Sequence, residues 1–297
     1  MKRLFISMLF NLCIVSVASG DFCTDHPALK ISRLFVPLEK GSNHINPYIV
    51  NIEAIYLLQK GTDSKMIMDY ISWYLEHANY PDRSELTGTI YDYAINCKTG
   101  KEKSAGTYDS VDGYAGTFLV MVYEYYKMTK DAKIIQKNRE KLKDIAYLLG
   151  FLQEEEGLTR ALFYKKSKYL MDNCEAYGGI KAFNRLSKEM EWGENQYYIE
   201  LENTIKDGIL SFLYSEERGD FYWAMEGKNV YAPNWDKLYP DAFSQIFPIL
   251  YDILEEMPQL KETLWKKFTE RYANKPDLFF SEQKLILELT EKRMTGK

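Results

Sequence analysis

The chain has 297 residues, of which 46% are hydrophobic, so it is long enough to bury a large core. Its formal net charge is −5 and its basic residues are scattered, which argues against a nucleic-acid partner. Aromatic residues make up 15% of the chain, with 24 Tyr and 5 Trp. Core packing explains most of these aromatic residues. The alternative interpretation is that some of them line a cleft and stack on sugar rings.

Residues 1–20 have the pattern of a secretory signal peptide. Lys2 and Arg3 form a charged start, residues 4–17 an apolar stretch, and residues 18–20 a small-residue cleavage site. The apolar stretch is short for a membrane span. We therefore expect residues 21–297 to form one domain, secreted or periplasmic, monomeric and without stable membrane insertion.

Cysteine and histidine are both scarce after the signal peptide. Cys23, Cys97 and Cys174 remain, and three cysteines allow at most one internal disulfide. The pairing is open, and Cys23–Cys97 is one possibility. The three histidines are scattered and lack metal-ligand spacing: His26, His44 and His77. A zinc site and a Ser-His-Asp triad are therefore not expected, and no metal or organic cofactor is implied.

Hydrophobic periodicity predicts a series of helical hairpins after an irregular segment at 21–44. The helix pairs are 47–60 with 64–78, 110–129 with 132–155, 173–189 with 194–214, and 240–255 with 260–272, followed by a ninth helix at 281–292. The connections carry extended pieces at 89–93, 162–164 and 219–224. In the second hairpin an almost wholly apolar helix precedes an amphipathic one, which is typical of an inner ring wrapped by an outer ring.

One short pattern recurs along the chain. An aromatic ring stands at positions 48, 114, 177 and 243, so the steps are 66, 63 and 66 residues. From the second copy onward, a small residue follows the ring and an acid stands two positions before it. A nearly fixed period of this size indicates an array of one supersecondary unit. The sequence thus predicts an all-α fold, an α/α toroid of helical hairpins that is incomplete against the twelve helices of a six-hairpin ring.

The toroid would gather five acids at one end, because each stands at or just before the start of an inner helix: Asp109, Asp112, Asp172, Glu175 and Asp241. One interpretation is capping, since acids spaced by three residues resemble a capping box and suit the helix dipole. The other is a cleft in which one protonated carboxyl assists a leaving sugar oxygen and a second activates water. Gathered like charges raise one another's pKa, which keeps one carboxyl protonated.

Several aromatic residues could stack or orient a sugar in such a cleft: Tyr114, Tyr177, Trp192, Trp223 and Trp235. For two of them, Trp192 and Trp235, an anchoring role in loops is the alternative interpretation.

Three segments resemble the six-hairpin glycosidases, nearest glycoside hydrolase family 8 and its relatives. Residues 109–116, DSVDGYAG, are similar to the acidic opening of an inner helix where that family has its general acid. Residues 172–177, DNCEAY, are similar to the stretch that grips the distorted sugar, and residues 239–243, YPDAF, to the segment that supplies the general base. The acid of that family is normally Glu, and an Arg absent here usually follows the third segment, where Ser244 and Gln245 stand instead.

The resemblance implies a secreted glycoside hydrolase that cleaves a polysaccharide or oligosaccharide with inversion. Asp112 or Asp109 would be the general acid and Asp241 the general base, while Asp172 and Glu175 hold the sugar. A non-catalytic glycan-binding or polysaccharide-assembly protein is the alternative, motivated by the departures just described. A polysaccharide lyase is disfavoured, because it needs a base beside a group that neutralises a uronate, and His is scarce.

Overall fold

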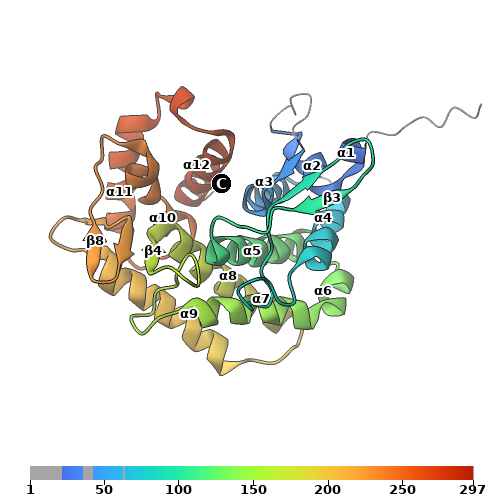
Figure 1. Ribbon diagram of the computed structural model, residues 1–297. Coiled ribbons are helices and arrows are strands. Elements are labelled where there is room, and N and C mark those ends of the chain that lie inside the picture. The colour runs from blue at the N-terminus through green and yellow to red at the C-terminus, as the bar shows by residue number, and fades with distance from the viewer. Residues whose placement is uncertain (1–21, 36–42, 63, 297) are drawn as a thin grey trace, which may run out of the picture.

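Five helices of the part of the chain that is described face one another around a central axis (Figure 1). The structure is a computed structural model that describes residues 22–35, 43–62 and 64–296. The inner helices are α3 (Pro47–Gln59), α5 (Val111–Thr129), α8 (Leu170–Glu189), α10 (Phe247–Leu250) and α12 (Ser281–Thr295). Each contacts the next in this order, and α12 contacts α3, so the inner ring closes.

Amphipathic helices cover this ring from outside (Figure 1). They are α4 (Ser64–His77), α6 (Lys133–Lys137), α7 (Arg139–Leu152), α9 (Gln196–Gly208) and α11 (Pro258–Tyr272). The alternation of inner and outer helices confirms the predicted α/α toroid. The helix expected at 132–155 is divided at Asn138, which leaves helical geometry (φ −110°, ψ 22°), and α9 continues into a π-helical turn at Ile209–Leu213.

The prediction of an irregular segment at 21–44 was wrong for its first half. Residues Phe22–Asp25 form α1 and Pro27–Ser32 form α2, with Pro27 at the first helical position, where its missing N–H costs nothing. Helix α2 packs against α3 and α4, and the Cys23–Cys97 disulfide ties α1 to a connecting loop. These tertiary contacts stabilise helices that are too short to form alone. Cys174 is a buried free thiol, and the predicted signal peptide lies outside the described residues.

Short antiparallel strands lie in the connections. One sheet joins β1 (His44–Ile45), β2 (Tyr93–Ile95) and β3 (Glu102–Ser104), with His44 opposite Ala94 and Tyr93 opposite Ser104. A second joins β4 (Ser167–Tyr169), β7 (Ala224–Glu226) and β8 (Asn229–Tyr231), and a third joins β5 (Tyr214–Ser215) to β6 (Asp220–Phe221). Of the strand expected at 89–93, only Tyr93 belongs to an observed strand, where it begins β2. Residues 162–164, also expected to be extended, form a turn that precedes β4.

The helix predicted at 240–255 is mostly not α-helical. A π-helical turn spans Leu238–Ala242, α10 covers only four residues, and Asp252 has a positive φ of 62°. Pro248 supplies a physical reason, because its ring removes a backbone donor and clashes with the preceding turn of a continuous helix.

Helices α5 and α8 approach each other so closely that only glycine fits at their crossing. A Cβ on Gly116 would collide with the backbone oxygen of Glu175, and one on Gly179 would collide with the backbone of Gly116. Gly116 and Gly179, each two positions after an aromatic ring, therefore serve helix packing. Their effect is to hold the first turns of α5 and α8, with Asp112, Asp172 and Glu175, side by side.

Candidate active site

A pocket of about 250 Å³ opens at the end of the ring where the inner helices begin. Its walls come from α3, α5, α8, α12 and the segment before α10, so segments far apart in sequence meet there. The lining residues are Asn46, Tyr48, Asp109, Ser110, Tyr114, Met171, Asp172, Tyr239, Phe243, Phe247, Phe280, Glu282, Gln283 and Ile286. This set combines three carboxylates with aromatic rings and contains no Lys, Arg or His.

Asp172 is the acid that combines access to the pocket with a strongly perturbed environment. It stands in the first turn of α8, is half-buried, and lines the pocket. Burial raises the pKa of its carboxyl well above the usual range, and the nearby charges of Asp112, Glu175 and Asp109 raise it further. A carboxyl in this environment keeps its proton at a pH at which an ordinary Asp has lost it.

Asp112 lies behind the pocket wall and is completely buried. The Thr159 hydroxyl donates to its Oδ2 at 2.6 Å, and the Gly113 amide donates to its Oδ1 at 3.0 Å. Burial raises the pKa of this carboxyl to about 6, although both hydrogen bonds favour the charged form. Asp112 therefore acts on its neighbours through its charge, since the structure leaves it no surface for a ligand.

Glu175 is the second buried acid of this cluster, with 1% of its surface exposed. The Tyr48 hydroxyl donates to its Oε1 at 2.7 Å, and burial raises the pKa of its carboxyl well above the usual range. Gly113 makes room for the carboxylates, because a Cβ there would lie 2.9 Å from Glu175 Oε2 and 3.9 Å from Asp172 Oδ1. Asp112, Asp172 and Glu175 thus form one acidic cluster, of which only Asp172 lines the pocket.

The mouth of the pocket carries two further carboxylates. Asp109 is exposed and precedes α5, whereas Glu282 is half-buried in the first turn of α12. Glu282 was missed by the sequence analysis, because α12 lacks the recurring acid–ring pattern. The one signal in the sequence was the position of Glu282 in the first turn of the ninth predicted helix, at 281–292.

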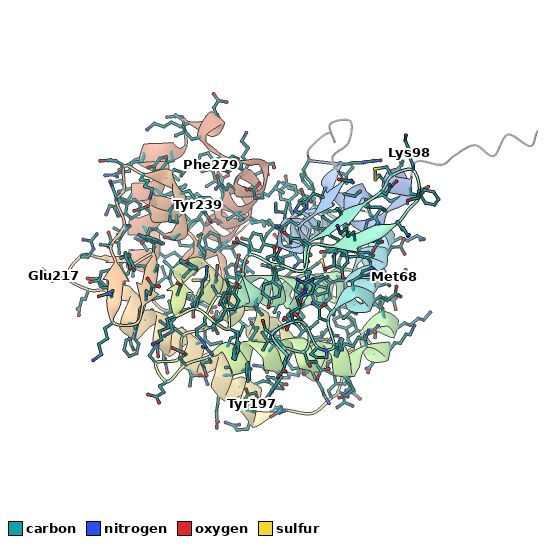
Figure 2. The ribbon with its side chains drawn as sticks, viewed as in Figure 1. Met68, Lys98, Tyr197, Glu217, Tyr239 and Phe279 are labelled. Atoms are coloured by element: carbon teal, nitrogen blue, oxygen red, sulfur yellow. A yellow bond between two sulfur atoms is a disulfide. The ribbon has the colours of Figure 1, made fainter. Side chains whose placement is uncertain are left out.

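Tyr114 and Tyr239 are among the tyrosines that line this pocket. Tyr114 donates to Asp92 Oδ1 at 2.9 Å and accepts from Asn46 Nδ2 at 2.9 Å, so its ring is fixed. Tyr239, labelled in Figure 2, is 52% exposed and lines the pocket. Burial and the charge of Asp172 raise the pKa of Tyr239 to about 12, so it remains a hydrogen-bond donor.

Asp241 is not brought to this pocket. Its carboxylate accepts from the Asn234 amide at 2.9 Å and pairs with Lys237 Nζ at 3.1 Å, and it is 5% exposed. The π-helical start of this repeat displaces Asp241 from the position that the period predicted. Its carboxylate is engaged by the segment that precedes the π-helical turn, and this turn has no side-chain capping bond.

The capping interpretation accounts only in part for the acids of α5 and α8. The N-cap residues are Ser110 and Tyr169, neither of which makes a side-chain capping bond. Asp112 accepts from the first-turn amide of Gly113, as a capping acid would, but it also accepts from the Thr159 hydroxyl across the structure.

Four of the five predicted aromatic residues lie away from the pocket lining. Tyr177 is 4% exposed, and Trp223 stacks on Tyr169 at 6.3 Å. Trp235 donates to Asp220 at 2.8 Å, with Lys267 over its ring at 4.1 Å. Trp192 follows the C-terminus of α8, about 30 Å along the helix from Asp172, and donates to Gln136. Tyr114 alone of the five lines the pocket.

Two features are absent from the described residues. No group of three or more His, Cys, Asp or Glu in residues 22–35, 43–62 and 64–296 is arranged to hold a metal ion. None of the helices within these ranges is long and apolar enough to cross a membrane.

Solved structures with the same architecture come from carbohydrate-processing enzymes. A GH76 α-mannanase from Bacteroides thetaiotaomicron matches with a TM-score of 0.53 at 9% identity, over 93% of this chain and 79% of that one. A cellobiose 2-epimerase from Bacillus thermoamylovorans matches with a TM-score of 0.53 at 10% identity, over 84% and 72%. A rhamnosidase from Klebsiella oxytoca, solved with rhamnose bound, matches with a TM-score of 0.56 at 10% identity, over 92% of this chain and 53% of that one.

These identities show a shared fold and nothing finer. No family model matches the sequence, and a search of curated proteins found no match. The fold class is therefore the α/α toroid, and the narrower resemblance to glycoside hydrolase family 8 stays a prediction.

Proposed function

We propose that this protein is a carbohydrate-active enzyme, a glycoside hydrolase whose site is the acidic pocket at the start of the inner helices. The single observation that carries the proposal is Asp172, a half-buried carboxyl that lines a pocket and is held protonated by burial and by three neighbouring acids. The same toroid in a mannanase and a rhamnosidase supports a sugar substrate.

The proposed roles differ from those expected from the sequence. Asp172 is the general acid, because its raised pKa lets it donate a proton to the leaving glycosidic oxygen. Asp109 is the general base, because it is exposed at the mouth and can accept a proton from an attacking water. Asp112 and Glu175 are positioning residues, because their proximity raises the pKa of Asp172.

The pocket also offers a surface for the sugar itself. Tyr239 and Phe280 are 52% and 69% exposed and line the pocket, so their faces can stack on the C–H face of a pyranose ring. Glu282 and Asp109 can accept hydrogen bonds from sugar hydroxyls. A pocket of about 250 Å³ suits a single sugar ring, since sites for drug-sized ligands start at about 300 Å³.

We propose that hydrolysis inverts the anomeric carbon, as the resemblance to family 8 implies. Inversion needs room for a water between acid and base. The two proposed carboxylates approach the pocket from different elements, Asp109 from the segment before α5 and Asp172 from α8. Proton NMR of the first anomer released checks this point.

The experiment is an assay of reducing-end release from a panel of manno-, xylo-, gluco- and rhamno-oligosaccharides. The variants are Asp172→Asn and Asp109→Asn, and the matched control is Asp207→Asn, which changes an exposed acid on α9. General acid or base removal should lower kcat by about 10²- to 10⁴-fold in the first two and leave the control unchanged. Full activity in both active-site variants would dismiss the assignment, and calorimetric binding without turnover in the wild type would favour a glycan-binding protein.

A further inference from the structure

A second, smaller cavity lies at the end of the inner ring away from the acidic pocket. We call it the far cavity, and its volume is about 60 Å³. On α8 it is lined by Lys181 and Arg185, whereas the acidic pocket is lined by Asp172, about 14 Å earlier along the same helix. Aliphatic side chains from the other four inner helices form an apolar wall: Ile52, Ile55, Val120, Leu250 and Leu289.

Three positively charged side chains line the far cavity. Lys181 and Arg185 stand four residues apart on α8 and so share one face of the helix, where like charges destabilise each other. Arg293 joins them from α12. The helix dipole does not account for Lys181, because this residue lies two turns before the end of α8 at Glu189 and the dipole acts mainly in the last turn.

One carboxylate lies between two of these cations. Asp252 Oδ2 is 3.4 Å from Lys181 Nζ and 3.7 Å from Arg293 Nη1. Glu255 lies 3.9 Å from Lys181, but its side chain is 73% exposed, so water screens its charge. Asp252 is therefore shared between two cations, and the far cavity keeps a net positive charge.

Two donors of the far cavity lack a partner in the described part of the chain. Arg185 makes no ion pair or hydrogen bond with any residue of the described ranges. Tyr251 lines the cavity and is 8% exposed, and its hydroxyl likewise makes no hydrogen bond within those ranges. Glu124, the other acid of the lining, pairs with Lys127 at 2.7 Å. A buried hydroxyl without a partner costs free energy, which an oxyanion in the cavity would recover.

We propose that the far cavity is a binding site for a small organic carboxylate, an inference that does not depend on the proposed function. The net positive charge selects an anion, and two arginines suit a planar carboxylate because guanidinium groups donate paired hydrogen bonds. The aliphatic wall favours a ligand with a short apolar tail over an inorganic ion such as phosphate. The volume limits this tail to a few carbon atoms, because a single water already needs about 10–15 Å³.

The test is isothermal titration calorimetry with propionate at constant ionic strength, since salt screens non-specific attraction to surface cations. Wild-type protein should bind propionate. Arg185→Gln and Arg293→Gln should each bind it about tenfold more weakly, because each change removes a charge-assisted hydrogen bond. Both arginines are exposed, so both variants should fold. Lys188→Gln is the matched control, because it removes one positive charge from α8 outside the far cavity and should leave the affinity unchanged.

Comparison ligands test the chemistry of the site. Propionamide has the same shape without the charge, and propylamine has the opposite charge, so neither should bind. Phosphate should bind more weakly than propionate, because it has no tail to place against the aliphatic wall. Saturation-transfer NMR should show the propionate methyl group in contact with wild-type protein, and the Arg185→Gln, Arg293→Gln double variant should abolish this signal.

The outcomes separate this inference from the proposed function. No propionate binding by the wild type, or equal binding by Arg185→Gln, Arg293→Gln and Lys188→Gln, overturns the proposal. Phosphate that binds more tightly than propionate, or propylamine that binds at all, overturns the choice of an organic carboxylate. Asp172→Asn should bind propionate as the wild type does, and its loss of binding would place the ligand in the acidic pocket instead. Propionate binding by a protein that hydrolyses no glycan counts against the proposed function and supports this inference.

Discussion

Replacing Asp112 by Asn should make the stability of this protein less sensitive to pH. The folded carboxyl keeps its proton up to about pH 6, whereas an unfolded Asp loses it near 3.8. Between these values the folded state binds more protons than the unfolded state, so the free energy of unfolding of the wild type falls as pH rises. The contribution of the Asp112 carboxyl to the free energy of unfolding is fully present below pH 3.8 and is lost as pH rises through 6.

The magnitude follows from the two pKa values. A rise from 3.8 to about 6 corresponds to about 3 kcal/mol at neutral pH. Asn has the shape of the protonated acid and still accepts from the Gly113 amide, while its nitrogen can donate to the Thr159 hydroxyl. Removing the Asp112 charge also lowers the pKa of Asp172, which further increases the stability of the variant at neutral pH.

The assay is urea unfolding of wild type and Asp112→Asn at several pH values from 3.5 to 7.5. The two should be of similar stability at the acidic end, and the variant should be more stable by about 3 kcal/mol at the neutral end. Asp207→Asn, which changes an exposed acid, should track the wild type throughout. A stability difference that does not change with pH would refute the claim that Asp112 is a buried, destabilised carboxylate.

Three further predictions concern the scaffold. Tyr48→Phe removes the donor to the buried Glu175 carboxyl and should lower the free energy of unfolding at pH 7 by about 1–3 kcal/mol, measured by urea unfolding. Gly116→Ala forces a Cβ into the α8 backbone, so thermal unfolding should show a net loss of about 1–3 kcal/mol despite the better helix propensity of Ala, and an unchanged or higher Tm would contradict the packing argument. Replacing both Cys23 and Cys97 by Ser opens a loop with a sequence separation of 74 and should cost about 4 kcal/mol in denaturant unfolding, with no loss expected only if the bond does not form.

The recurrence of acid, ring and small residue predicted the architecture, because that pattern has a direct packing cause. Gly116 and Gly179 are required where α5 and α8 cross, and the acids of both helices fall at one end as a consequence. The two short N-terminal helices were not predictable from local pattern, since a disulfide and contacts with α3 and α4 stabilise them.

The composition of the site was predicted only in part, because burial depends on tertiary contacts. Asp112 and Asp172 both stand in the first turn of an inner helix. Asp112 is nevertheless buried against Thr159, whereas Asp172 lines the pocket. Asp241 is displaced by a non-helical start that includes Tyr239. Glu282 reaches the pocket only because α12 closes the ring against α3.

The most direct measurement is a crystal structure of the Asp172→Asn variant soaked with an oligosaccharide that the wild type cleaves. The account predicts a sugar ring in the pocket between Tyr239 and α5, with a glycosidic oxygen within hydrogen-bond distance of residue 172. A sugar bound elsewhere, with this pocket occupied only by water, would contradict it.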